Sequence, residues 1–285
     1  MDFLSFISGI ICIVFAFIIM IRLMHYAKFY APSYFFWIGV ILTFVGIVSL
    51  VYPLKFLFIL NREIAVFVLF SGILISAISL LSPVKKHSSP TSNQKIDDLM
   101  PDYAFNEIHE VEVKASPEKA KQVLQTTGVK DIPAARLLMK IRGIADDDVD
   151  MSGRAANNLA GSDTISTPDF NFFVVSLNEW ITVMILKSVI ITNNSHQPEP
   201  PEITSLEQFM EFNEPGYMKV AVNFRFIPNG NDNTILTTET RNYGITPKDS
   251  RTFGYYWRII YPGSAIIRRV WLNTIKNRSE KSSQL

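Results

Sequence analysis

The sequence predicts an α+β protein in which apolar N-terminal helices precede an antiparallel sheet that is closed by one long C-terminal helix. Three observations lead to this prediction. The first 84 residues carry almost no charge. Several later segments alternate polar and apolar residues with the period of two that is typical of a half-buried strand. Residues 253–275 instead repeat apolar side chains with the spacing of an amphipathic helix.

Three uncharged runs in the N-terminal part are each long enough to form a membrane-spanning helix. They are residues 3–21, 31–54 and 64–84, with 19, 24 and 21 residues. About 20 apolar residues cross the roughly 30 Å hydrocarbon core of a bilayer as a helix. The first run lacks the basic start and the cleavage site of a signal peptide. We therefore predict that residues 1–84 form a three-span transmembrane region of a multi-pass cell-membrane protein.

Lys and Arg residues near the ends of these runs predict the orientation. Cytoplasmic loops carry an excess of such residues, so the side with more of them is expected in the cytoplasm. This places the N-terminus outside and the C-terminal domain in the cytoplasm. No charged residue lies within the runs, which argues against a transporter or pump. The richer side holds Arg22, Lys28, Lys85 and Lys86, and the other holds Lys55 and Arg62.

Composition excludes several classes of function. The chain has 285 residues and a net charge of +1, which gives no reason to expect a nucleic-acid partner. Its single cysteine, Cys12, excludes an internal disulfide and a CxxC metal or redox site. The acidic residues of segment 146–150 alternate as calcium ligands do, but Met151 replaces the required glycine, which favours a solvated turn. We predict no metal and no cofactor.

The remaining chain divides into a linker, a domain and a tail. Residues 85–101 are polar and contain two prolines, which predicts a linker between the membrane region and a domain over residues 102–280. Residues 281–285 form a short tail. The domain opens with a strand over residues 107–115, followed by a helix that Ser116 and Pro117 initiate. A second helix is predicted over residues 131–143, and a long loop over residues 144–169.

Four more strands and the closing helix complete the predicted domain. The strands are residues 172–177, 180–192, 217–227 and 234–243, with a short helix over residues 205–212 before the last two. A turn at residues 228–230 joins the last two strands as a hairpin. The closing helix carries an aromatic stripe and is kinked at Pro262, because proline cannot donate the helical hydrogen bond at its own position.

Three short motifs in these elements resemble a known superfamily. They are IHEVEVKASPEKA in the first strand and helix, TTETR in the last strand, and YYWRIIYPGSAIIRR in the closing helix. These motifs are similar to the START-like helix-grip superfamily, also called SRPBCC, over roughly residues 103–278. The resemblance implies a curved antiparallel sheet around a long C-terminal helix, with a cavity for an apolar or amphipathic ligand. The five predicted strands are fewer than the six or seven usual in the superfamily.

Candidate residues for such a cavity come from the first strand, the last strand and the closing helix. His109 shares the apolar face of its strand. Glu239 and Arg241 share one face of the last strand with Tyr243, and if that face is buried they must pair with each other or with a polar group of the ligand. If it faces solvent, they form an ordinary surface ion pair. The candidates are His109, Glu239, Arg241, Tyr243, Phe253, Tyr256 and Trp257.

The sequence therefore predicts a membrane-anchored START-like domain that binds an apolar or amphipathic small molecule, lipids included, at the cytoplasmic membrane face. Its expected partners are the bilayer and this ligand. One alternative is a cyclase- or hydrolase-like enzyme that uses His109 or Glu239 as a general base. Another is a non-catalytic regulatory or assembly protein of the membrane. No catalytic motif is present in the sequence, which favours the binding function over an enzyme.

Overall fold

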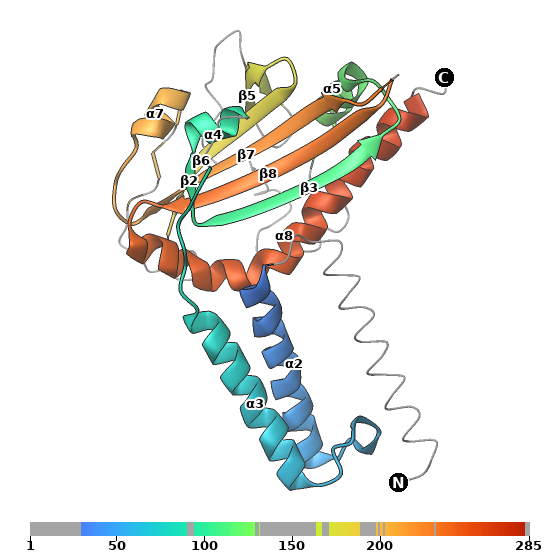
Figure 1. Cartoon of the computed structure of the whole chain (residues 1–285), viewed down its shortest axis with the longest axis vertical. Helices are drawn as coiled ribbons and strands as arrows, with labels where there is room; N and C mark the ends of the chain where they lie inside the picture. The colour runs from blue at the N-terminus through green and yellow to red at the C-terminus, as the bar shows by residue number, and fades with distance from the viewer. Residues whose placement is uncertain are drawn as a thin grey trace. The chain divides into compact units, whose positions relative to one another are not determined.

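The computed structural model describes residues 30–89, 94–128, 131, 164–166, 171–188, 198, 200–201, 203–230 and 232–282. These residues group into two compact units (Figure 1). The first unit comprises the described residues up to Pro83 together with Gly254–Pro262. The second unit comprises Val84–Phe253 and the chain from Gly263 onward. The C-terminal helix α8 (Pro247–Ser282) thus contributes residues to both units.

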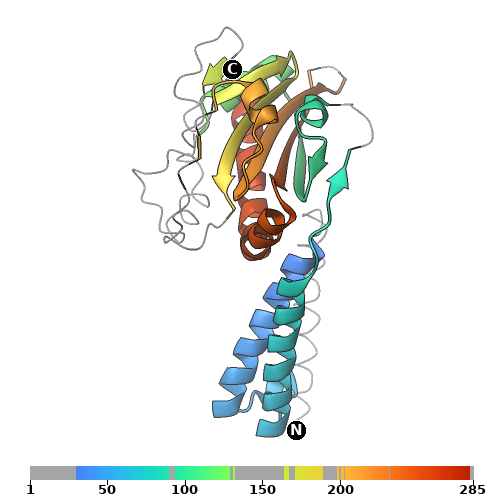
Figure 2. The same ribbon diagram turned by 90° about the vertical axis from the view of Figure 1, so that its left-hand side faces the viewer.

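Two apolar helices dominate the first unit. Helix α2 (Ala31–Val51) and helix α3 (Arg62–Leu81) lie side by side along their length, and the loop between them contains the short 3-10 helix η1 (Lys55–Leu57) (Figure 2). Both α2 and α3 are long and apolar enough to cross a membrane. The described residues therefore contain two such helices where the sequence predicted three, because the run over residues 3–21 lies outside the described part of the chain.

Glycines let the backbones of α2 and α3 approach each other closely. A Cβ atom on Gly46 would lie 2.6 Å from the Cα atom of Leu69. A Cβ atom on Gly72 would lie 2.7 Å from the carbonyl oxygen of Gly39. Both distances are too short for a real side chain, so larger residues would push the helices apart. Small residues at a helix contact are typical of membrane helix pairs.

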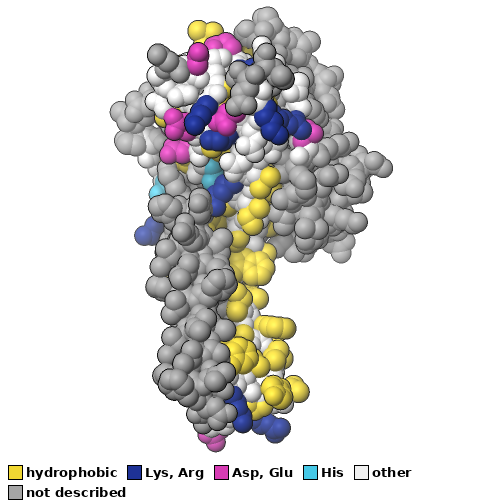
Figure 3. All heavy atoms as spheres, turned by 90° about the vertical axis from the view of Figure 1, so that its right-hand side faces the viewer, with side chains coloured by type: hydrophobic (Ala, Val, Ile, Leu, Met, Phe, Trp, Pro, Cys, Tyr) yellow, Lys and Arg dark blue, Asp and Glu magenta, His cyan; other side chains and the backbone are white. Residues whose placement is uncertain are grey.

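Large apolar side chains cover the outward surface of these two helices. Phe44 on α2 is 66% exposed, and Phe67 and Leu81 on α3 are 73% and 75% exposed. Figure 3 shows hydrophobic side chains along this part of the protein, with Lys and Arg side chains at its foot. An apolar surface of this extent is expected for helices that are surrounded by lipid.

The centre of α8 packs against α2 within the first unit. Pro262 lacks an N–H group and therefore leaves the carbonyl oxygen of Arg258 without its helical donor. The hydroxyl of Ser33 donates to this oxygen at 2.6 Å. The indole Nε1 of Trp37 donates to the next carbonyl, that of Ile259, at 3.0 Å. Helix α2 thus supplies the donor that the proline removes.

Aromatic residues at the start of α2 complete this contact. The rings of Tyr30 and Tyr34 lie 5.5 Å and 6.3 Å from the ring of Tyr261 on α8. The guanidinium Nη2 of Arg258 donates to the carbonyl of Ser82, just beyond the end of α3, at 2.6 Å. The sequence alone indicates a membrane-interface aromatic belt at Tyr30, Tyr34 and Trp37. The structure adds that all three contact α8.

An antiparallel sheet forms the centre of the second unit. It has five longer strands and the three-residue edge strand β4, in the order β3-β8-β7-β6-β5-β4, so the first and last long strands are neighbours. The predicted α+β class with a long C-terminal helix is confirmed. Strand β4 falls in the segment that we predicted as a loop. The strands are β3 (Phe105–Val113), β4 (Thr164–Ser166), β5 (Asn171–Ser176), β6 (Glu179–Lys187), β7 (Tyr217–Pro228) and β8 (Thr234–Gly244).

One face of this sheet packs against the second half of α8 and against helix α5 (Pro117–Gln125). Ser116 caps α5 as predicted, and its hydroxyl accepts a hydrogen bond from the Lys119 backbone N–H. Trp271 and Leu272 of α8 are buried in the same core as Phe224 of β7. The core on this face thus extends from the middle of the sheet to the end of the helix.

Shorter elements cover the opposite face of the sheet. Helix α4 (Lys95–Leu99) and helix α7 (Leu206–Glu211) contribute the buried side chains of Ile96 and Phe209 to a second apolar cluster. The small pair β1 (His87–Ser88) and β2 (Asp102–Tyr103) precedes the sheet. Segment 85–101 therefore differs from the predicted linker, because its second half is packed onto the domain.

Some predictions lie outside the described residues. These are nearly all of the second predicted helix, the acidic residues of segment 146–150, Cys12 and most of the tail.

Candidate functional site

Strand register divides the predicted site residues between the two faces of the sheet. On β8, Leu236 is part of the core that contains Trp271 of α8, so the alternate residues Thr238, Thr240 and Asn242 also face α8. His109 of β3 pairs with Thr238 and lies on the same face. Glu239, Arg241 and Tyr243 face the other way. These two groups therefore cannot line one cavity.

A buried polar cluster joins β3 to α8 on the first face. The Nε2 atom of His109 and the Oε1 atom of Glu107 are 2.7 Å apart, and the two residues are 6% and 1% exposed. The hydroxyl of Ser264 on α8 donates to the other carboxylate oxygen of Glu107 at 2.7 Å. Glu107 is therefore held from both sides, by the histidine on its own strand and by the helix.

Arg268 lies one helical turn beyond Ser264 and completes this cluster. Burial lowers the pKa of its guanidinium, while the negative charge of Glu107 acts in the opposite direction. The Nη1 atom of Arg268 is buried and has no hydrogen-bond partner among the described residues. The same is true of the Thr240 hydroxyl and of the Asn242 side-chain nitrogen, in residues that are 5% and 2% exposed.

Three buried polar groups without protein partners thus occur on the α8-facing side of the second unit. A buried polar group that lacks a partner costs about 1–3 kcal/mol, so such groups normally bind water or a polar atom of a ligand. The cluster does not have the arrangement of a hydrolytic triad. Ser264 donates to Glu107 and not to His109, whereas a serine nucleophile needs the histidine as its base.

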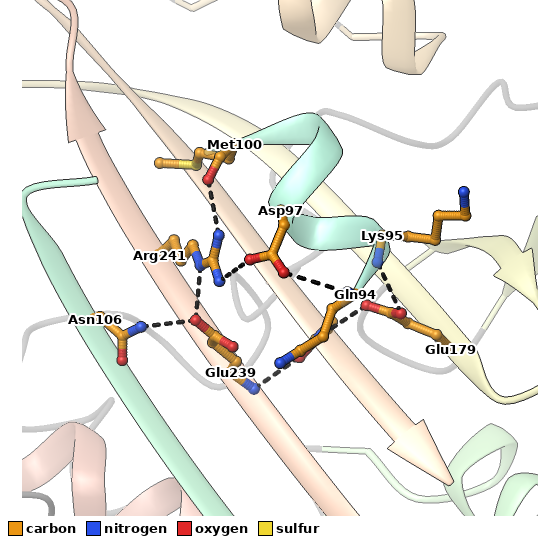
Figure 4. A network of polar contacts seen from close by, with 9 residues as sticks. Gln94, Lys95, Asp97, Met100, Asn106, Glu179, Glu239 and Arg241 are labelled. Atoms are coloured by element: carbon orange, nitrogen blue, oxygen red, sulfur yellow. Dashed lines mark hydrogen bonds and ion pairs between the residues drawn. The ribbon is translucent and has the colours of Figure 1, made fainter. Parts of the chain in front are cut away.

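A charged network occupies the opposite face of the sheet (Figure 4). The guanidinium of Arg241 donates to Glu239 at 2.7 Å, to Asp97 at 2.6 Å and to the carbonyl of Met100 at 2.9 Å. Burial acts to lower the pKa of Arg241, but the hydrogen bonds and charges of Glu239 and Asp97 outweigh it, so the pKa is raised. Arg241 therefore joins β8 to the segment that contains α4.

Amide side chains extend this network towards β6. The side chain of Asn106 donates to Glu239 at 2.7 Å. Asn223 accepts from the Glu239 backbone N–H at 2.9 Å and donates to Glu179 at 2.8 Å. The second oxygen of Glu179 accepts from the backbone N–H of Lys95 at 3.1 Å. If buried, Glu239 and Arg241 were expected to pair either with each other or with a polar group of the ligand. In the structure they are buried and pair with each other.

The other candidates lie in separate places. Tyr243 is partly buried on the outer face, with the ammonium of Lys86 5.8 Å from its ring centre. Phe253 is buried, and its ring centre lies 5.6 Å from that of Phe105. Tyr256 and Trp257 belong to the part of α8 in the first unit, where the Trp257 ring lies 5.8 Å from that of Tyr261.

Sequence reasoning missed Glu107, Ser264 and Arg268. Glu107 lies two residues before His109 in the same alternating strand, so the period of two could have placed it on the same face. Ser264 and Arg268 are four residues apart, the spacing of one helix face. The described residues contain no group of three His, Cys, Asp or Glu side chains suited to hold a metal ion.

Comparisons with known protein families, with curated proteins and with solved structures found no match for this chain.

Proposed function

We propose that this chain is a membrane-anchored START-like domain that binds an apolar or amphipathic small molecule, lipids included, at the cytoplasmic face of the cell membrane. The order of elements supports the proposal: a first strand and helix, a run of antiparallel strands in which the last pairs with the first, and a long closing helix. Helices α2 and α3 supply the anchor. A site that is held near the bilayer meets lipidic ligands at high effective concentration.

The observation that carries the binding function is the set of buried polar groups without protein partners on the α8-facing side. Thr240 and Asn242 are buried residues of β8. The hydroxyl oxygen of Thr240 and the side-chain nitrogen of Asn242 nevertheless have no hydrogen-bond partner in the described protein. An amphipathic ligand would place a polar group against them and its apolar part along the aromatic core. A ligand of this kind also offers acceptors for the free nitrogen of Arg268.

A matched pair of threonines on β8 allows a direct test. The full chain would be purified in a mild detergent and studied by native mass spectrometry. The wild type should carry a bound molecule of defined mass. The substitution Thr240→Val removes a hydroxyl on the α8-facing side without changing the shape and should lower occupancy. Thr237→Val makes the same change on the opposite face and should leave occupancy unchanged.

Two results would contradict the proposal. One is a wild-type protein with no bound molecule, even after incubation with an extract of membrane lipids. The other is equal occupancy in both variants, which would indicate that water satisfies the buried groups. Retained thermal stability in Thr240→Val ensures that any loss of occupancy reflects the site and not the fold.

The contacts of the two candidate bases favour binding over catalysis. One oxygen of Glu239 accepts hydrogen bonds from both Arg241 and Asn106. The Nε2 atom of His109 is hydrogen-bonded to the carboxylate of Glu107. A general base must be able to reach a substrate proton, and the contacts of both groups are made within the protein.

A further inference from the structure

A hollow of the domain lies beside the charged network. It has a volume of about 340 Å³, at the small end of the range of about 300–1,000 Å³ that is usual for ligand pockets. Its polar lining comes from the start of α4, from the turn between β5 and β6, and from β7. The polar lining residues are Gln94, Lys95, Ser176, Asn178, Glu179 and Arg225.

Three of these side chains have their acceptor atoms occupied within the protein. The side-chain oxygen of Gln94 accepts from the α4 backbone and from Asn223. That of Asn178 accepts from the ammonium of Lys121 at 3.3 Å. The hydroxyl oxygen of Ser176 accepts from the Asn178 backbone N–H at 3.3 Å. Each of the three still offers a donor to the hollow, an amide NH₂ group on Gln94 and Asn178 and a hydroxyl hydrogen on Ser176.

Two of the three charged side chains in the lining, Arg225 and Lys95, are positive. The guanidinium of Arg225 forms no hydrogen bond or ion pair with another described residue. Among the described residues, the ammonium of Lys95 contacts only Asp98, at 3.4 Å. The side chains of this pair are 57% and 46% exposed, so the pair is weak. The carboxylate of Glu179 is the one negative charge of the lining, and both of its oxygens already accept hydrogen bonds from Asn223 and Lys95.

From this lining we propose that the hollow is a binding site for a small anionic molecule with a carboxylate or phosphate group. The anion would accept hydrogen bonds from Arg225 and Lys95, which form the strongest contacts because they carry charge. The amides of Gln94 and Asn178 would orient it. Ile227 and Pro228 form the apolar wall and suit a short hydrocarbon part. This site is separate from the α8-facing cluster and does not depend on the function proposed there.

The test uses the full chain in nanodiscs of uncharged phosphatidylcholine. Inorganic phosphate, a short monocarboxylate and a glycerol phosphate would be titrated at constant ionic strength, with binding followed by calorimetry. We expect saturable binding of at least one of these anions. Arg225→Gln should weaken it about tenfold or more, as expected for the loss of a charged hydrogen bond. Asn178→Asp, which replaces the amide donor by a carboxylate, should weaken it as well.

Arg251→Gln is the matched control, because Arg251 is an exposed arginine of α8 outside the hollow. The Arg251→Gln variant should bind the anions with the same affinity as the wild type. A second set of nanodiscs, which contain an anionic phospholipid, distinguishes a soluble anion from a lipid headgroup as the source of the carboxylate or phosphate group. Binding of free anions to the wild type that is lost in Arg225→Gln supports a soluble ligand. A thermal stabilisation by anionic lipid alone, again lost in Arg225→Gln, supports a lipid headgroup as the ligand.

Two outcomes would overturn the proposal. The first is the absence of saturable binding or stabilisation by every anion and by anionic lipid. The second is binding that Arg225→Gln and Arg251→Gln change equally, since this would place the anion elsewhere on the protein.

Discussion

The guanidinium of Arg241 neutralises two carboxylates that the fold buries, Asp97 and Glu239. The side chains of all three residues are less than a tenth exposed. A buried ion pair contributes little net stability when complete, but removing one partner leaves an unpaired charge in a medium that solvates it poorly. The three residues therefore depend on one another, although Asp97 is distant in sequence from the other two.

We expect Arg241→Met to lower the free energy of unfolding by about 3–5 kcal/mol, because it leaves Asp97 and Glu239 buried without their cation. Chemical denaturation of the full chain in detergent measures this change. Arg225→Met serves as the control, since Arg225 makes no described ion pair and its loss should change the free energy of unfolding by less than about 0.5 kcal/mol. If both substitutions changed the free energy of unfolding equally, the ion pairs of Arg241 would have no special part in stability.

Asp102 links the small strand pair β1–β2 through its contacts with Lys86 and Ser88. Hydrogen bonds from Lys86 and Ser88 hold the pKa of this carboxyl below its ordinary value. A carboxyl with a lowered folded-state pKa stabilises the fold above its unfolded-state pKa of about 3.9. This contribution is lost as the pH falls through the lower, folded-state value.

Lys86→Gln should therefore raise the pKa of Asp102 towards its ordinary value, with Ser88 retaining part of the shift. NMR titration of the carboxyl carbon measures this change directly. Lys95→Gln removes a cation that pairs with Asp98 and should leave the Asp102 titration unchanged. Because the Lys86–Asp102 pair is solvent-exposed, the difference between wild type and Lys86→Gln should shrink at high salt. A difference that does not depend on salt would contradict the ionic origin of the shift.

Part of this residue-level organisation follows from the sequence. The period of two places Glu239, Arg241 and Tyr243 on one face and His109 on the apolar face of its own strand, and the structure has both arrangements. Which face of the sheet receives α8 is decided by long-range packing, so Arg241 and His109 were assigned to one cavity although they lie on opposite sides. Partners that come from a distant part of the chain, such as Asp97 for Arg241, cannot be identified from the periodicity of the sequence.

At the scale of elements, α8 depends on a helix from the other end of the sequence. A proline inside a helix usually costs about 3 kcal/mol or more, partly through the lost hydrogen bond. Here the orphaned oxygen of Arg258 accepts from Ser33, which is completely buried, and the neighbouring oxygen of Ile259 accepts from Trp37. Pro262 and these two donors therefore form one structural unit.

A double-substitution cycle tests this dependence. Ser33→Ala should destabilise the full chain by about 1–3 kcal/mol, because it leaves the Arg258 carbonyl without a donor. Pro262→Ala restores the N–H group that can donate within the helix. In the Pro262→Ala background, Ser33→Ala should cost clearly less, and thermal unfolding in detergent measures the difference. Strictly additive effects would show that Ser33 does not act on the proline kink.

The elements that the sequence predicted well are those with a local signal. Strands β7 and β8 agree with the prediction to within one residue at either end, because alternation and the turn near Gly230 define them. Helix α4 was missed because it has five residues and lies in a polar segment. Its apolar residues Ile96, Leu99 and Met100 do have helical spacing, which was the available signal.

At the scale of the whole molecule, the orientation in the membrane remains a prediction from charge. Lys55 and Arg62 flank the loop between α2 and α3, while Lys85 and Lys86 follow α3 at its other end. The excess on the second side, with Arg22 and Lys28 added from the sequence, predicts that the C-terminal domain lies in the cytoplasm.

A reporter that is active only in the cytoplasm, fused after Leu285, should therefore be active. A reporter that requires export should be inactive at the same position. The matching fusion within the loop between α2 and α3, near Phe58, should give the opposite pattern. Activity of the exported reporter after Leu285 would reverse the orientation and remove the cytoplasmic part of the proposed function.

The hydrogen bond from Ser33 to Arg258 spans 225 positions of the sequence. During synthesis, Ser33 leaves the ribosome long before its acceptor exists. Until the last helix is made, the hydroxyl of Ser33 and the indole of Trp37 lack these acceptors at the end of an apolar helix. A chain that stops early, at any point before residue 258, keeps this defect permanently. Incomplete chains therefore differ from finished ones at helix α2, where the hydrogen bonds of Ser33 and Trp37 form only after the C-terminal helix is complete.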